Sequence, residues 1–92
     1  MKKIIMFHGL ECPHCRVMHP IVDKLIAEGC NIIKLEVWHN EDNANKMRGY
    51  AKIITKASGG DLPVPTFLDE EGKRAICGEM SYEDLKKWIN KK

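Results

Sequence analysis

Two cysteines separated by two residues, Cys12 and Cys15, lie where the character of this sequence changes. Residues 3–7 before them are a short apolar run of the kind found in a central strand. Residues 16–28 after them carry apolar side chains at helical spacing. This order places Cys12 at a helix N-terminus, where the positive end of the helix dipole favours thiolate over thiol. Because the thiolate is the species that attacks a disulfide, the pattern predicts thiol–disulfide exchange.

The length and composition of the chain predict a single domain over residues 1–92. Its charged fraction of 30% and apolar fraction of 43% are ordinary for a soluble globular protein. The formal net charge is only +2 and the basic residues form no stripe interleaved with aromatics, so we expect no nucleic-acid partner. The first apolar run is too short for a secretory signal, and no run is long enough for a membrane span. We therefore expect a cytoplasmic monomer without a membrane partner.

The apolar positions predict seven elements in the order β-α-β-α-β-β-α. The expected strands are residues 3–7, 31–38, 64–68 and 74–77, and the expected helices are residues 16–28, residues 41–56 and a last helix that starts at Ser81. The first three elements form a βαβ unit, which requires parallel strands and a right-handed crossover. The last two strands flank a tight turn and form a hairpin. We therefore expect an α/β fold with a four-stranded mixed sheet and helices on both faces.

Two prolines make the pattern more specific. Pro20 lies inside the expected helix, five residues after Cys15, and a proline inside a helix is costly. Val64-Pro65-Thr66 opens the third expected strand. Thioredoxins typically read Cys-Gly-Pro-Cys with a proline at the same distance, and they carry a Thr/Ile/Val-Pro-Thr loop. The chain therefore resembles the thioredoxin-fold superfamily over nearly its whole length.

Within that superfamily, the outline of this chain is closest to glutaredoxins and other small thioredoxin-like proteins, because it begins with the strand that leads to the cysteines. The Cys-Pro-His-Cys motif, with Pro13 and His14 between the cysteines, is similar to that of the DsbA family of periplasmic oxidants. The resemblance implies a thiol–disulfide oxidoreductase that works without a cofactor. The implied partners are protein thiols and disulfides, with glutathione as a further candidate, and a reductase or other electron donor.

The resemblance also implies a role for each residue of the motif. Cys12 is expected to be the exposed nucleophile of low pKa. Cys15, one turn into the helix and more buried, is expected to resolve the mixed disulfide. His14, together with Pro13, is expected to tune the stability of the Cys12 thiolate.

The second landmark of the superfamily implies a substrate groove. The loop formed by Val64, Pro65 and Thr66 is expected to lie against the cysteines and to bind an extended peptide. The Val64-Pro65 bond is expected to be cis, because cis peptide bonds are almost confined to X-Pro pairs.

Metal binding is the alternative to redox chemistry. His8, His14 and His19 lie near the cysteine pair in sequence, and Cys/His clusters suit zinc or copper. The second cysteine pair of a structural zinc site is missing, so we expect no metal. The competing hypothesis is a thioredoxin-like module that binds a metal or a protein without redox turnover.

The other two cysteines, Cys30 and Cys77, are not expected to form a second redox pair. In the proposed topology they lie at opposite edges of the sheet, separated by three strand spacings of about 4.8 Å. That distance is about twice what a disulfide spans. We expect both to be small apolar side chains.

Overall fold

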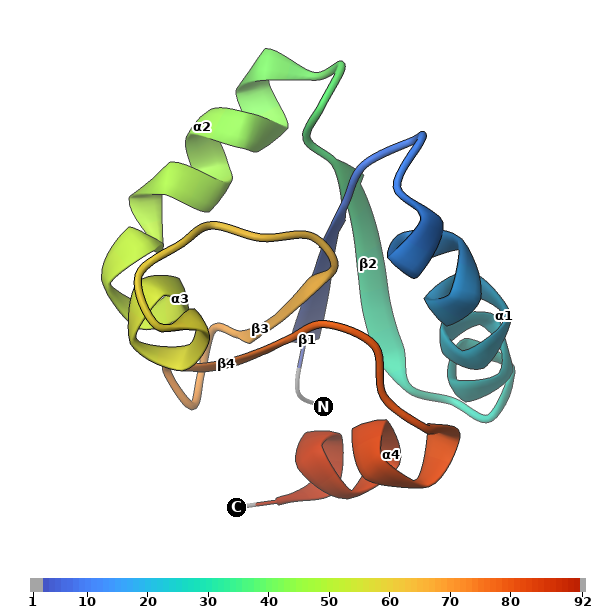
Figure 1. Cartoon of the computed structure of the whole chain (residues 1–92). Coiled ribbons are helices and arrows are strands. Elements are labelled where there is room, and N and C mark those ends of the chain that lie inside the picture. Colours follow the sequence, from blue (N-terminus) through green and yellow to red (C-terminus); the bar gives the residue numbers. More distant parts are fainter. Residues whose placement is uncertain (1–2, 92) are drawn as a thin grey trace.

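The computed structural model describes residues 3–91 and shows a mixed four-stranded sheet between two layers of helices (Figure 1). The sheet has the strand order β2-β1-β3-β4. The elements are β1 Lys3–His8, α1 Pro13–Ala27, β2 Asn31–Glu36, α2 Glu41–Gly49, α3 Ala51–Ser58, β3 Thr66–Asp69, β4 Arg74–Cys77 and α4 Tyr82–Asn90. The predicted α/β fold is therefore confirmed. No helix among residues 3–91 combines the length and the apolar character needed to cross a membrane.

β1 is the central strand, as its unbroken apolar run predicted. It pairs in parallel with β2, where Ile5 lies opposite Ile33, and antiparallel with β3, where Ile5 lies opposite Leu68. β3 and β4 form the predicted antiparallel hairpin. The four apolar residues of β1 after Lys3 are fully buried because helices cover both faces of this strand.

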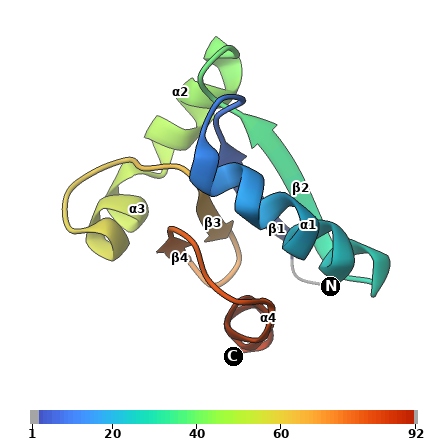
Figure 2. The same ribbon diagram turned by 45° about the vertical axis from the view of Figure 1, so that its right-hand side comes forward.

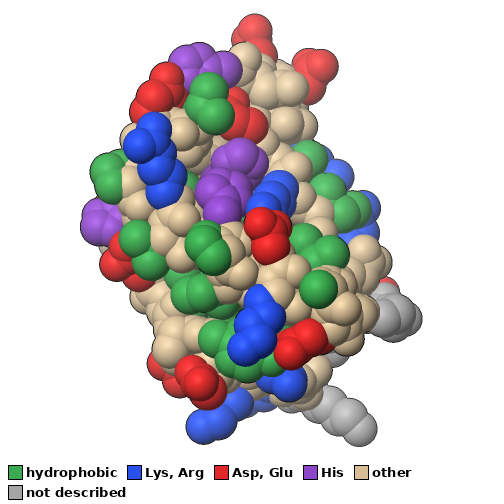
Figure 3. Space-filling model, turned by 90° about the vertical axis from the view of Figure 1, so that its right-hand side faces the viewer, with side chains coloured by type: hydrophobic (Ala, Val, Ile, Leu, Met, Phe, Trp, Pro, Cys, Tyr) green, Lys and Arg blue, Asp and Glu red, His purple; other side chains and the backbone are tan. Residues whose placement is uncertain are grey.

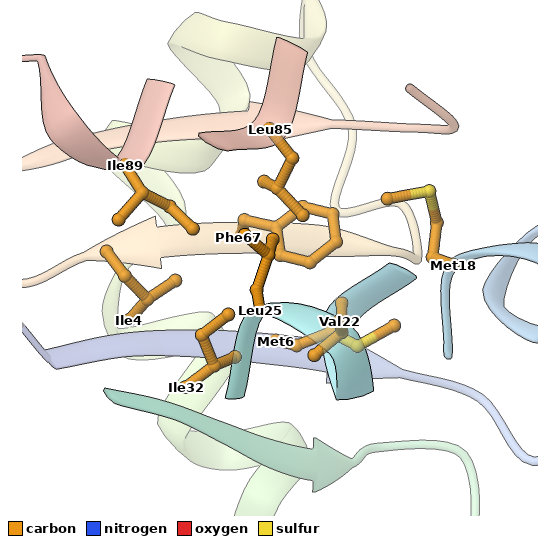
Figure 4. Close-up of a cluster of buried hydrophobic side chains, with 9 residues drawn as sticks. All are labelled: Ile4, Met6, Met18, Val22, Leu25, Ile32, Phe67, Leu85 and Ile89. Atoms are coloured by element: carbon orange, nitrogen blue, oxygen red, sulfur yellow. The ribbon is translucent and has the colours of Figure 1, made fainter. Parts of the chain in front are cut away.

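The two faces of the sheet carry separate hydrophobic clusters. Alternate residues of a strand point to opposite faces, so Ile4 and Met6 of β1 face α1 and α4, while Ile5 and Phe7 face α2 and α3 (Figures 1 and 2). The first cluster joins the sheet to α1 and α4 (Figure 4) and consists of Ile4, Met6, Met18, Val22, Leu25, Ile32, Phe67, Leu85 and Ile89. The second, smaller cluster is built from Ile5, Phe7, Met47, Ile54 and Leu68.

The prediction of a single helix over residues 41–56 is wrong, because the segment forms two helices that meet at Tyr50. Gly49 ends α2, and glycine is a weak helix former. Tyr50 leaves helical geometry, with φ −104° and ψ 17°, and packs against the second cluster. On either side of the break, Met47 of α2 and Ile54 of α3 pack against the same face of the sheet.

Several element ends also differ from the sequence prediction. The first helix begins at Pro13 rather than residue 16, because Cys12 caps it. The third strand begins at Thr66 rather than residue 64, and the second ends at Glu36 rather than residue 38. The last helix follows Ser81 as predicted, and the Ser81 hydroxyl accepts a hydrogen bond from the backbone N–H of Asp84.

Candidate active site

Cys12 is the N-cap of α1. Its backbone is extended, with φ −74° and ψ 118°, and its Sγ accepts a hydrogen bond from the backbone N–H of Cys15 at 3.3 Å. Pro13 occupies the first turn, where a backbone N–H would have no partner within the helix, so the missing N–H of proline costs nothing. The sequence therefore places the first sulfur of the motif at the positive end of α1, as predicted.

The expectation that Cys12 is exposed is wrong. Only 4% of Cys12 is accessible, against 0% for Cys15, so the predicted difference in burial is small. The capping geometry turns Sγ of Cys12 inward, where the thiol donates to the carbonyl oxygen of Val64 at 3.7 Å. The loop that was predicted to bind substrate thus contacts the first thiol.

Ionisation of the Cys15 thiol is strongly disfavoured. Burial is the main cause, the neighbouring Cys12 adds to it, and together they raise the pKa of Cys15 to about 12, although a hydrogen bond with the Gly9 backbone opposes this change. Cys15 is therefore a protonated thiol near neutral pH.

The loop expected to form a substrate groove contacts Cys12 through the carbonyl oxygen of Val64. The Val64-Pro65 bond is cis, as predicted. We call residues 63–65 the proline loop. Its fixed points are the Thr66 hydroxyl, which donates to the carbonyl oxygen of Pro63 at 2.6 Å, and the backbone N–H of Gly78, which donates to the carbonyl oxygen of Pro65 at 2.9 Å.

His14 lies on the exposed surface of the first turn of α1. Its Nδ1 is 3.2 Å from a carboxylate oxygen of Glu79, in the segment between β4 and α4. Among residues 3–91, no hydrogen bond joins His14 to Cys12. Sequence reasoning identified His14 but missed Glu79, because 65 positions along the chain separate the two residues.

A second group of contacts missed by sequence reasoning fixes the segment before Cys12, which we call the entry loop (residues 9–11). The Glu36 carboxylate accepts hydrogen bonds from the backbone N–H groups of Leu10, Trp38 and His39 at 2.9, 3.1 and 2.7 Å. Glu11 pairs with Nε2 of His39 at 2.7 Å. These contacts tie the entry loop to the end of β2.

Gly9 belongs to the same arrangement. A Cβ atom at this position would overlap the indole ring of Trp38, so only glycine fits beneath that ring. The chain offered no sequence signal for the contact, because Gly9 and Trp38 follow the ends of two different strands, which become neighbours only in the sheet.

The three histidines considered as metal ligands do not converge. His8 and His19 are in ring contact, while His14 pairs with Glu79. Within the described part of the chain, no three His, Cys, Asp or Glu side chains are arranged to hold a metal ion.

Cys30 and Cys77 lie at opposite edges of the sheet, as predicted. Cys30 immediately precedes β2 and Cys77 ends β4, and all four cysteines are free thiols. Cys77 Sγ lies 3.3 Å from the hydroxyl oxygen of Thr66, which can accept a hydrogen bond from the Cys77 thiol while its own proton goes to Pro63.

Comparison with known proteins supports the fold. No family model matches the chain, and no curated protein matches its sequence. A glutaredoxin from Archaeoglobus fulgidus is similar in structure, with 21% identity, a TM-score of 0.65, and coverage of 98% of this chain and 88% of that one.

Two plant structures show a weaker likeness. A buckwheat glutaredoxin–glutathione complex has 18% identity and a TM-score of 0.52, covering 95% of this chain and 68% of that one. The holo form of glutaredoxin C1 from Populus tremula x tremuloides has 18% identity and a TM-score of 0.50, covering 95% and 75%. At these identities the likeness establishes a thioredoxin-like fold of the glutaredoxin type.

Proposed function

We propose that this chain is a thiol–disulfide oxidoreductase that cycles Cys12 and Cys15 between dithiol and disulfide. The observation that carries the proposal is the hydrogen bond from the Cys15 backbone N–H to the Cys12 sulfur at the start of α1. This backbone N–H can donate to the negative charge that the Cys12 sulfur carries when it attacks a disulfide, and hydrogen bonds to a charged acceptor are stronger than those to a neutral one. The buried Cys15 thiol is then the second reactant.

The proposed cycle has two exchange steps. The Cys12 thiolate attacks a substrate disulfide, one substrate sulfur leaves as a thiolate, and a mixed disulfide forms at Cys12. Cys15 then loses its proton and attacks Sγ of Cys12, which releases the second substrate thiolate and leaves a Cys12–Cys15 disulfide. An external dithiol or other electron donor returns the protein to the reduced state.

The proline loop supplies the proposed substrate groove. Val64 contacts the Cys12 thiol, and the next two residues of the chain, Pro65 and Thr66, are buried. We propose that an extended segment of a partner protein, or glutathione, lies along this loop with its disulfide at Cys12. The proposal further places the chain in the cytoplasm, as a monomer that receives electrons from a reductase.

Trapping of the mixed disulfide tests the order of attack. Cys15→Ser is expected to accumulate mixed disulfides with protein substrates or glutathione, because the resolving thiol is gone. Cys12→Ser is expected to accumulate few, and Cys77→Ser serves as a control that leaves both reacting sulfurs in place. Non-reducing electrophoresis and mass spectrometry give the result, and equal trapping by the first two variants would contradict the assignment.

A thiol count with and without reductant separates redox turnover from metal binding. The redox proposal predicts that oxidation removes two thiols, and that proteolytic fragments locate the loss at Cys12 and Cys15. Metal analysis of protein purified under reducing conditions addresses the competing hypothesis. A stoichiometric metal that blocks oxidation of this pair would overturn the proposed function.

Pro13 and His14 are proposed to tune the redox potential. A positive charge on His14, two residues after Cys12 in the chain, would favour the thiolate, which exists only in the reduced form, so His14→Ala should make the potential more negative. An exposed charge pair contributes at most about 1 kcal/mol, which corresponds to roughly 20 mV for two electrons. Equilibration with glutathione redox buffers measures the shift, and an unchanged or less negative potential would exclude a tuning role.

A further inference from the structure

The indole ring of Trp38 covers the backbone of Gly9. A Cβ atom added to Gly9 would lie only 2.3, 2.4 and 2.7 Å from three carbon atoms of the ring, so the ring lies directly over the glycine Cα. Trp38 follows β2, and the side of the molecule that carries α1 and β2 presents hydrophobic side chains among charged and histidine side chains (Figure 3). Trp38 is half exposed and Gly9 is buried, so a surface ring shields this part of the entry loop from solvent.

The shielded backbone contacts both cysteines of the motif. The carbonyl oxygen of Gly9 accepts a hydrogen bond from the backbone N–H of Cys12 at 3.1 Å. The Gly9 backbone also hydrogen-bonds the thiol of Cys15. Burial raises the pKa of this thiol but the bond from Gly9 lowers it, so the Gly9 N–H is the donor and the sulfur is the acceptor. One residue thus fixes the backbone of Cys12 and donates to the sulfur of Cys15.

Backbone hydrogen bonds hold the ring in place. The N–H of Trp38 donates to a carboxylate oxygen of Glu36 at 3.1 Å, and the same oxygen accepts the N–H of Leu10 at 2.9 Å. The N–H of Val37 donates to the carbonyl oxygen of His8 at 2.8 Å. These contacts join the two chain segments just before and just after the residue that the ring covers. The position of the ring is therefore set by the paired ends of β1 and β2.

A donor to the Cys15 sulfur has its largest effect in the second exchange step. The Cys15 S–H bond breaks and its proton goes to solvent. The sulfur electron pair forms the bond to Sγ of Cys12, and the substrate sulfur leaves with the electrons of the broken disulfide bond. Negative charge is present on the Cys15 sulfur during this step and absent from the resting thiol, so a hydrogen bond that strengthens with charge lowers the barrier. The Cys12 thiol cannot hydrogen-bond Cys15 at this stage, because its sulfur is bonded to the substrate.

We propose that the Gly9 N–H is a catalytic donor to Cys15 in the second exchange step, and that Trp38 is the positioning residue that holds this N–H against the sulfur. A glycine backbone has many accessible conformations, and without the ring the N–H would point at the sulfur for a smaller fraction of the time. The inference rests on the proposed thiol–disulfide exchange. It assigns Trp38 to resolution of the mixed disulfide rather than to its formation.

The test measures the two exchange steps separately. Reduced protein is mixed with an excess of bis(2-hydroxyethyl) disulfide, which presents no peptide for the protein to recognise, and samples are quenched with acid. Peptide mass spectrometry then follows the mixed disulfide at Cys12 and its conversion to the Cys12–Cys15 disulfide. Removing such a donor costs roughly 10²–10³-fold in rate, so for Trp38→Ala, which only loosens it, we expect conversion to be about tenfold slower. Formation should stay within about twofold of the original protein.

Two further variants separate the contact with Gly9 from a general loss of stability. Trp38→Phe keeps an aromatic ring over the glycine, so its conversion rate should stay within about twofold of the original protein. Ile33→Ala is the matched control, because it shortens another partly exposed apolar side chain in β2, at a position opposite Ile5 rather than beside the entry loop. Both of its rates should be unchanged.

Three outcomes would overturn the role of Trp38. They are an unchanged conversion rate in Trp38→Ala, equal slowing of both steps in that variant, and conversion in Trp38→Phe as slow as in Trp38→Ala. If Trp38→Ala does not fold, Gly9→Ala supplies the same perturbation, because its Cβ and the indole cannot occupy the same space. Unchanged conversion in Gly9→Ala would then contradict the inference.

The same experiment distinguishes failure of the inference from failure of the proposed function. If the original protein forms no mixed disulfide at Cys12, the proposed function is wrong and the role of Trp38 falls with it. If the mixed disulfide forms and resolves equally fast with and without the indole ring, only the inference about Gly9 and Trp38 is wrong.

Discussion

The two loops that flank Cys12 are held in place by different kinds of interaction. The entry loop is bound by the charged side chains of Glu36 and His39, which lie at or near the surface. The proline loop is bound by neutral groups, the Thr66 hydroxyl and the Gly78 backbone N–H. Neutral hydrogen bonds do not titrate, whereas the charged contacts weaken when one partner loses its charge. Changes in pH should therefore loosen one side of the site and leave the other unchanged.

The largest effect on the free energy of unfolding is expected for the proline loop, which neutral hydrogen bonds hold in place. Thr66→Val keeps the volume of this fully buried side chain but leaves the carbonyl oxygen of Pro63 without its hydroxyl donor. We expect a loss of about 2 kcal/mol in the free energy of unfolding, equal at mildly acidic and mildly alkaline pH. Urea unfolding at both pH values measures it, with Thr66→Ser as the control that keeps the hydroxyl. A loss that changed with pH would contradict the comparison.

A smaller effect is expected where the entry loop passes beneath Trp38. Gly9→Ala forces the indole ring outward, and because Trp38 is half exposed we expect a cost of about 1 kcal/mol. Adding Trp38→Ala should remove most of the penalty in a double-mutant cycle. Gly49→Ala is the matched control, because a Cβ there meets open space. A Gly9→Ala penalty that persisted without the indole would point to the backbone instead.

The carboxylate that fixes the entry loop should act only when it is ionised. Partial loss of water disfavours the charge on Glu36, but its three backbone N–H donors outweigh this and hold its pKa below the ordinary value of 4.5. Its contribution is therefore present above that value and is lost as pH falls through the lowered pKa. Glu36→Gln should reduce stability at neutral pH, by less than Thr66→Val, and match the original protein at strongly acidic pH.

Urea unfolding across the acidic range checks this prediction for Glu36. Glu71→Gln, in the exposed turn between β3 and β4, serves as the control. If Glu36→Gln and Glu71→Gln had the same effect at neutral pH, the three backbone contacts would be of no consequence for the loop.

The smallest effect is expected for the exposed pair of His39 and Glu11. The hydrogen bond and charge of Glu11 raise the pKa of His39 above 6.5. The stability contributed by the pair is fully present below 6.5 and is lost as pH rises through the raised pKa. His39→Gln should therefore lower the melting temperature slightly at mildly acidic pH and leave it unchanged at about pH 9. Thermal unfolding of both proteins at the two pH values measures this difference in melting temperature. A difference larger at pH 9 than at mildly acidic pH would contradict the prediction.

Much of the fold follows from local sequence signals. The apolar run of β1 predicted a strand buried on both faces, and Ser81 predicted the start of α4. The position of Cys12 before a helical pattern predicted a cysteine at a helix N-terminus. These features depend on neighbours within a few residues, so periodicity and capping preferences are enough to find them.

The features that sequence reasoning missed depend on distant residues. The break at Tyr50 accompanies the packing of Met47 and Ile54 in one cluster against the sheet, and helical periodicity alone does not show how a helix packs on a distant element. The burial of Cys12 depends on Val64, which is 52 positions away. The hydrogen bonds that hold the entry loop depend on Glu36, whose side chain reaches Leu10 only because β1 and β2 are paired.

The sequence by itself determined the order of elements apart from the division between α2 and α3, and it placed the cysteine pair at the start of a helix, because both rest on the chemistry of nearby residues. The cis bond before Pro65 was expected from the resemblance of the Val64-Pro65-Thr66 loop. Only the tertiary structure decided that Cys12 is covered, that His14 faces Glu79, and that the rings of His8 and His19 are in contact. The physical reason is that burial and pairing of polar groups depend on which strand ends and helix turns are brought together, and that choice is made by packing of the whole sheet.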